Sequence, residues 1–72
     1  MIEYTRHAKR RMKWRKISES EIQFTLNTPD NVQPLGNSRY HAHKTIEGKI
    51  LRVTYVKEDR RIKIVTALWK GE

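Results

Sequence analysis

Three residues near the N-terminus carry side chains that together could bind a phosphodiester and act on it. His7, Arg11 and Arg15 are spaced four residues apart, so on a helix they form one ridge. Arg guanidinium groups bind phosphate oxygens through paired hydrogen bonds, and imidazole can accept or donate a proton. RNA supplies its own nucleophile, the 2′-hydroxyl, so cleavage needs only proton transfer and cations at the phosphate. We therefore expect His7 to act as base or acid and Arg11 and Arg15 to hold the phosphate.

A simpler interpretation of this ridge stays open at the level of sequence. Arg at the edge of a helix often only covers the core with its aliphatic stem. Arg11 and Arg15 could instead pair with Glu19 or Glu21, and His7 could bond a neighbouring backbone group. The spacing does not choose between these alternatives.

The second half of the chain offers further groups for proton transfer. His41 and His43 are two residues apart on an expected strand, so they share a face. We expect the second proton-transfer group to be His41, His43 or Tyr55. With His7 the two histidines could form a three-histidine metal site, but no acidic ligand or Cys is suitably placed. We therefore expect no metal and no cofactor, and the simplest alternative is a solvated strand face.

Basic and aromatic side chains on both halves suit nucleic acid. Cations neutralise phosphates, and aromatic rings stack on unpaired bases. Packing of the aromatic rings in the core is the alternative. The expected contacts come from Arg10, Arg11, Arg15, Arg52, Lys63, Tyr40 and Trp69.

The distribution of charge favours a polyanionic partner. The net charge is +8, with 16 Lys and Arg against 8 Asp and Glu. Residues 1–16 contain seven Lys and Arg against one acidic residue, 17–38 contain only acidic charges, and 39–72 contain nine basic against four acidic residues. An even coat that only improves solubility would not segregate in this way. RNA is the expected partner, ahead of DNA, and the alternatives are an acidic protein or an anionic membrane surface.

Length and composition limit the architecture. A chain of 72 residues forms one domain, residues 1–72, with a thin core, and the absence of Cys excludes disulfides and Cys-based zinc sites. No apolar run resembles a signal peptide or a membrane span. We therefore expect a cytoplasmic protein that does not interact with membranes.

Two short helices are expected to precede the strands. Residues 5–15 lack Gly and Pro and contain good helix formers, with Thr5 as a plausible N-cap. Ser18 and Glu21 match a capping box at the start of a second helix, which Asn27 and Pro29 close.

The rest of the chain predicts strands. They cover residues 31–35, 39–45, 49–56 and 61–69, and Pro34 makes the first an edge strand or irregular structure. Simple alternation places Ile62, Ile64, Thr66 and Leu68 on one face of the last strand. The expected fold is α+β, with two N-terminal helices packed on a three- to four-stranded antiparallel sheet.

The N-terminal residues also form a motif that resembles a known group of proteins. His7-Ala8, Arg11-Met12, Arg15 and Ile17 give the pattern HA-x-x-RM-x-x-R-x-I, followed by Thr28-Pro29-Asp30 and by Ile64-Val65-Thr66. It is similar to a family of small prokaryotic domains grouped with RelE/ParE/BrnT-like toxins. Relatives commonly have Gly where this chain has Lys16.

This resemblance implies a RelE/ParE-toxin-like fold and a toxin of a toxin-antitoxin system, with an acidic antitoxin as partner. Many members of that superfamily are endoribonucleases (mRNA interferases), which implies a metal-independent ribonuclease with His7, Arg11 and Arg15 as functional positions, and Thr66 more weakly. The alternatives are a non-catalytic nucleic-acid-binding module and a protein-interaction domain that inhibits a replication or translation factor. A homo-oligomer is compatible with each of these.

Overall fold

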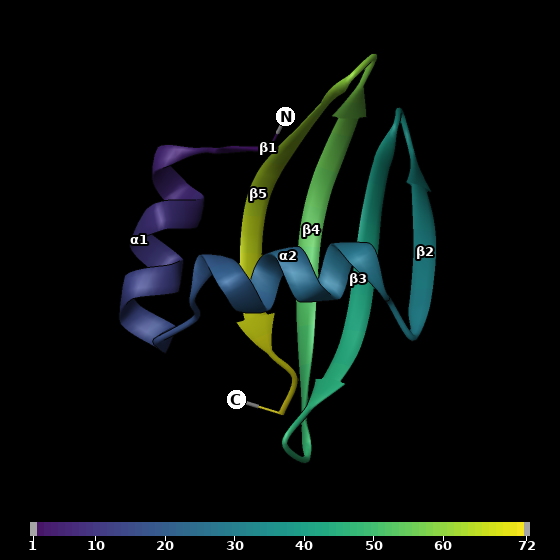
Figure 1. Cartoon of the computed structure of the whole chain (residues 1–72). Coiled ribbons are helices and arrows are strands. Elements are labelled where there is room, and N and C mark those ends of the chain that lie inside the picture. The colour runs from purple at the N-terminus through teal and green to yellow at the C-terminus, as the bar shows by residue number, and fades with distance from the viewer. Residues whose placement is uncertain (1, 72) are drawn as a thin grey trace.

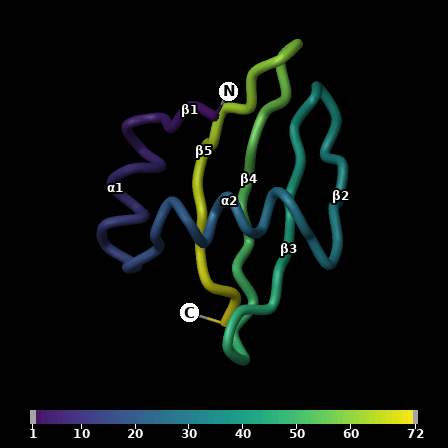
Figure 2. Tube along the Cα trace, in the orientation of Figure 1, coloured from purple at the N-terminus to yellow at the C-terminus, as the bar shows by residue number. Residues whose placement is uncertain are grey.

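The computed structural model describes residues 2–71 and contains two helices and one sheet (Figure 1). The elements in chain order are β1 (Ile2–Tyr4), α1 (Arg6–Arg15), α2 (Glu19–Asn27), β2 (Asn31–Gly36), β3 (Arg39–Ile46), β4 (Lys49–Glu58) and β5 (Arg61–Trp69). The strands lie in the order β1-β5-β4-β3-β2. In Figures 1 and 2, α2 crosses one face of the sheet while α1 lies beside β5.

The helix boundaries follow the predicted caps. The Thr5 side-chain oxygen accepts a hydrogen bond from the backbone N–H of Ala8 at 3.0 Å. Ser18 and Glu21 form the predicted capping box, with each side chain accepting the other residue's backbone N–H at 3.1 and 2.9 Å. Lys16 ends α1 in the left-handed conformation, with φ of 54°. Both predicted helices are therefore confirmed.

The predicted antiparallel sheet of three to four strands is wrong, because the sheet has five strands and is mixed. β1 pairs with β5 in parallel, with Ile2 beside Ile62 and Tyr4 beside Ile64. Three residues are too few to show an alternating pattern, and their partner strand lies at the other end of the chain. The other neighbouring strands pair antiparallel, and β2 with Pro34 is an edge strand.

A bulge in β5 corrects the predicted alternation of that strand. Thr54 pairs with Thr66, whereas Tyr55 pairs with Ile64, so Val65 has no partner in the register. The extra residue reverses which side chains face the helices beyond it. The core therefore takes Ile64 before the bulge and Ala67 and Trp69 after it. Thr66 and Leu68 lie on the other face, which α2 does not cover and which we call the open face.

The apolar core fills the space between the helices and the sheet. Burial of apolar surface is the main favourable term in folding, so this layer holds α1 and α2 against the strands. The buried members are Ala8, Met12, Ile17, Ile22, Leu51, Val53, Ile64, Ala67 and Trp69.

α1 closes the edge of β5 where β1 ends. The backbone N–H of Thr5 donates to the carbonyl of Ile64 at 3.1 Å, and its hydroxyl donates to the carbonyl of Val65 at 3.3 Å. Nη1 of Arg15 donates to the carbonyl of Ala67 at 2.8 Å. These bonds satisfy edge groups that would otherwise attract another strand. Within residues 2–71, neither helix is long and apolar enough to cross a membrane.

Candidate nucleic-acid interface

The open face gathers two histidines and an arginine at its centre. On β3, His41 and His43 flank Ala42, which points into the other face and is buried. The register places His43 beside Arg52 and His41 beside Thr54 on β4. Since directly opposed side chains of neighbouring strands contact each other, these residues form one group. We call His41, His43 and Arg52 the sheet cluster.

Two polar atoms of the sheet cluster are buried without a hydrogen-bond partner. They are Nδ1 of His43 and Nε of Arg52. Within residues 2–71, no carboxylate lies within ion-pair distance of Arg52. Buried polar atoms are normally bonded, and an unbonded buried donor costs free energy. The sheet cluster therefore has unused hydrogen-bonding capacity, but these two atoms are closed off from solvent, and an anion would reach them only after a side-chain movement.

The surroundings favour neutral imidazoles in the sheet cluster. Burial lowers the pKa of His41, and the charges of Arg52 and His43 lower it further. Burial also lowers the pKa of His43, followed by the charges of Lys70 and Arg52. The rings lie edge to face with centroids 6.2 Å apart. A neutral imidazole beside a fixed cation is the form that can accept a proton from a substrate.

A small hollow extends the sheet cluster toward the end of β5. It measures about 260 Å³ and is lined in part by His43, Ile50 and Lys70. The one carboxylate in its lining, Asp30, accepts hydrogen bonds from Lys44 at 3.2 Å and from the backbone N–H of Thr45 at 2.9 Å. Both hydrogen bonds lower the pKa of the Asp30 carboxyl, and the one from the backbone N–H of Thr45 has the larger effect.

Lys70 was not among the residues expected from sequence. It follows the last strand, outside any alternating pattern, and its backbone N–H donates to the carbonyl of Ile50 at 2.8 Å. That bond extends the pairing of β5 with β4 by one step. Lys70 thereby borders the hollow that His43 also lines.

The predicted helix ridge exists, but it is separate from the sheet cluster. Nε of Arg11 donates to Nε2 of His7 at 3.5 Å, and the Arg11 guanidinium lies 5.5 Å from the ring centroid of Trp14. The alternative ion pairs with Glu19 or Glu21 do not form within the described chain. No hydrogen bond or ring contact within residues 2–71 joins the ridge to His41 or His43.

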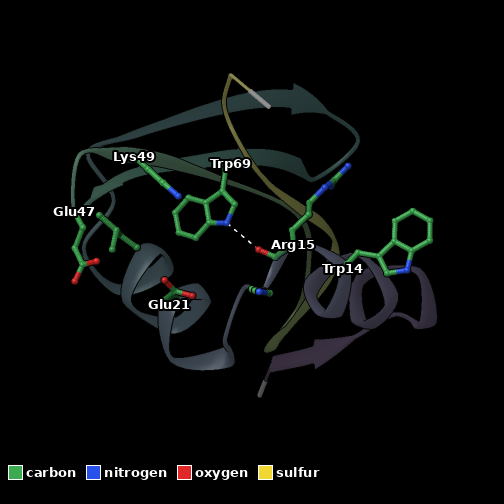
Figure 3. A pocket seen from close by; sticks show the side chains of 8 residues that line it. Trp14, Arg15, Glu21, Glu47, Lys49 and Trp69 are labelled. Atoms are coloured by element: carbon green, nitrogen blue, oxygen red, sulfur yellow. Dashed lines mark hydrogen bonds between the residues drawn. The ribbon is translucent and has the colours of Figure 1, made fainter.

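The three aromatic candidates lie on the face that the helices cover. Tyr40 and Tyr55 stack with centroids 5.4 Å apart, and burial together with Tyr40 raises the pKa of Tyr55. Trp69 is only 8% exposed, and its indole N–H donates to the carbonyl of Arg15 at 3.1 Å (Figure 3). The structure thus places these rings away from the sheet cluster. Lys63 lies on the open face, beside Val56.

A second hollow, of about 420 Å³, lies between the helices and the ends of β4 and β5 (Figure 3). Two carboxylates, Glu21 and Glu47, line it together with three cations, Arg15, Lys16 and Lys49. Its charge is therefore mixed, whereas among the described residues the sheet cluster has no carboxylate within ion-pair distance of Arg52. Arg10, on the exposed side of α1, lines neither hollow. No group of three or more metal-ligating side chains occurs in the described part of the chain.

Comparison with known proteins assigns the chain to a family. No curated protein and no solved structure matches it significantly. These comparisons do not connect the chain to RelE/ParE-like toxins, so that relationship stays a prediction. The model of the family "Domain of unknown function (DUF4258)" matches residues 4–69. This range includes both the ridge and the sheet cluster, and the chain belongs to the DUF4258 family.

Proposed function

We propose that this protein binds RNA on the open face and cleaves it without a metal ion. The observation that carries the proposal is the sheet cluster: two imidazoles side by side, next to an Arg whose Nε has no partner. Arg52 would hold the phosphate, and His41 and His43 would transfer the protons. The expected proton-transfer role thus moves from His7 on the ridge to the histidines on the sheet.

The reaction is an internal transfer of the phosphoryl group. One imidazole removes the proton of the ribose 2′-hydroxyl, and that oxygen bonds to the adjacent phosphorus. The bond from phosphorus to the 5′-oxygen breaks, and the other histidine, protonated once the bound phosphate offsets the charge of Arg52, donates its proton to the leaving oxygen. The products are a 2′,3′-cyclic phosphate and a 5′-hydroxyl. Arg52 neutralises charge on the phosphate as the transition state forms.

A toxin role in a toxin-antitoxin system is part of the same proposal and rests on charge. A net charge of +8 on 72 residues suits both RNA and an acidic antitoxin that would cover the same surface. Growth arrest on inducible expression, accompanied by loss of mRNA, would support this role. Growth arrest with intact mRNA would point to inhibition of a protein factor.

The test of catalysis uses the purified protein and single-stranded RNA in EDTA. We expect His41→Ala and His43→Ala each to slow cleavage by about 100-fold or more, the usual contribution of a positioned acid or base. Lys13→Ala, on the exposed side of α1 outside the ridge, is the matched control and should retain most of the activity. A strand of the same sequence without 2′-hydroxyls should bind without being cut. Undiminished cleavage by both sheet variants would remove the assignment.

A non-catalytic RNA-binding module is the second candidate. The Arg52 cation beside the two imidazoles supports it equally, because phosphate binding needs no proton-transfer group. Salt-sensitive RNA binding that depends on Arg52, without any cyclic phosphate product, would select this candidate.

A further inference from the structure

We propose that the outer side of α1 is a second subsite on the same RNA, where an unpaired base stacks on Trp14. This inference rests on the proposed RNA binding and adds the substrate class, a single strand rather than a duplex. Trp14 is the ring, and His7 and Arg11 hold the phosphate next to that base.

The exposure of Trp14 is the first observation. Its side chain is 72% exposed, whereas the other tryptophan, Trp69, is 8% exposed and packs in the core. In Figure 3, the Trp14 ring projects from α1 on the side away from Trp69. Large apolar rings are usually buried, and an exposed indole offers a flat surface to a base.

The charges around Trp14 are the second observation. The Arg11 guanidinium lies 5.5 Å from the centroid of the Trp14 ring. Nε of the same guanidinium lies 3.5 Å from Nε2 of His7. α1 contains no acidic residue, and within residues 2–71 no carboxylate lies within ion-pair distance of Arg11. The ring therefore has cations beside it on α1; Trp14 also borders the second hollow, where Glu21 and Glu47 are the carboxylates. Such a surface favours a nucleotide over a neutral apolar ligand.

The position of the ridge connects this subsite to the open face. Ala8 and Met12 are the buried residues of α1, which packs beside β5. Arg11 and His7 precede Arg15 by about one and two turns along the same ridge. Arg15 bonds to the edge of β5, so the ridge borders that edge of the sheet.

Arg15 connects α1 to the edge of the sheet. Its Nη1 donates to the carbonyl of Ala67 at the edge of β5, and in Figure 3 its side chain extends from the helices toward the strands. Next to Ala67 is Thr66, which pairs with Thr54, and Thr54 pairs with His41. Neighbouring strands are about 4.8 Å apart, so one extended single strand can contact both the ridge and the sheet cluster.

A duplex would not use this subsite. Its bases are already stacked and paired, and an exposed aromatic ring reads bases that are splayed out of a helix. The structure thus favours loops, ends or unpaired segments of RNA as ligands.

The test measures binding of three labelled probes of about 12 nucleotides, a length within the range covered by small single-strand binding folds. They are a single-stranded 2′-O-methyl oligoribonucleotide, which cannot be cleaved, the same backbone without bases, and the corresponding duplex. We expect Trp14→Ala to weaken binding of the first probe by about 5- to 150-fold, the range of a lost base stack. The same variant should not change binding of the abasic strand or the duplex. Trp14→Phe should restore most of the affinity, and Lys13→Ala is the matched control on α1.

Failure of this inference is distinguishable from failure of the proposed function. If Arg52→Gln weakens binding of the single strand while Trp14→Ala does not, RNA binding stands and the subsite is wrong. If Trp14→Ala weakens the abasic strand equally, the ring does not stack on a base and the inference is also wrong. If none of the probes binds at physiological salt, both proposals fail.

Discussion

The chemistry of His41 and His43 follows from where β3 meets β4. Each ring is partly buried, and Arg52 lies beside them on the next strand. Both effects disfavour the charged imidazolium, so the pKa of each histidine is lowered. A bound phosphate would reverse the sign of the local field. The two imidazoles therefore lower the stability of the folded protein at low pH, whereas a bound phosphate would favour their protonation.

The first prediction follows from these lowered pKa values. The unfolded chain binds a proton at each histidine near pH 6.5, whereas the folded protein binds it at lower pH. The free energy of unfolding should therefore be greatest above about pH 6.5 and decrease as the pH falls toward the folded-state pKa. We expect urea denaturation to show lower stability at about pH 5.5 than at about pH 7.5. His41→Gln and His43→Gln should each reduce this difference.

His7→Gln is the matched control for that measurement. His7 is exposed on α1 and lies outside the sheet cluster. It should show the same decrease in stability with falling pH as the wild type. Equal pH dependence in all three variants would mean that the sheet histidines are not the groups responsible.

At the scale of elements, the turn after α1 shows how one residue departs from its local preference. Lys16 adopts φ of 54° and ψ of 48°, and its N–H donates to the carbonyl of Met12. Glycine is the usual residue at such a helix end, since a side chain is disfavoured in this conformation. The turn places Ile17 in the core and directs the chain into the capping box of α2.

Lys16→Gly is therefore expected to raise the free energy of unfolding by about 0.5–1 kcal/mol. Relief of the left-handed strain, about 1–2 kcal/mol, exceeds the greater entropy of glycine in the unfolded chain, about 0.4–1 kcal/mol. Urea denaturation at pH 7.5 provides the measurement. Lys13→Gly, three residues earlier inside α1, is the control and should lower stability by about 1 kcal/mol. A loss of stability in both variants would show that Lys16 is not strained.

Whole-molecule features were predictable where the interactions are local. The caps of both helices and the edge position of Pro34 follow from residues close in sequence. β1 could not be predicted, because its parallel partner lies at the far end of the chain. The bulge at Val65 was also missed, since Ile62–Trp69 alternates plausibly without it.

In the candidate site too, some features follow from nearby residues and others depend on the pairing of distant strands. That His41 and His43 share a face follows from strand periodicity, but their contact with Arg52 depends on the register of β3 and β4. That register is set by the turn at Glu47 and Gly48, both with positive φ. A two-residue turn of this kind fixes which residues oppose each other. In the sequence only Gly48 predicts a turn here, and it does not give the turn's length. The register of β3 and β4, and with it the sheet cluster, could therefore not be predicted.

The last prediction concerns the distribution of charge over the whole molecule. If RNA crosses the open face, only cations on that side release counterions from the strand. For single strands, the logarithm of the binding constant falls with the logarithm of salt concentration, with a slope of about −0.7 per phosphate contact. Fluorescence anisotropy at several salt concentrations should give a slope for Arg52→Gln that is smaller in magnitude by about 0.7. Lys13→Gln removes the same charge on α1 outside the ridge and should leave the slope unchanged. Equal slopes for both variants would mean that net charge attracts RNA without directing it to the open face.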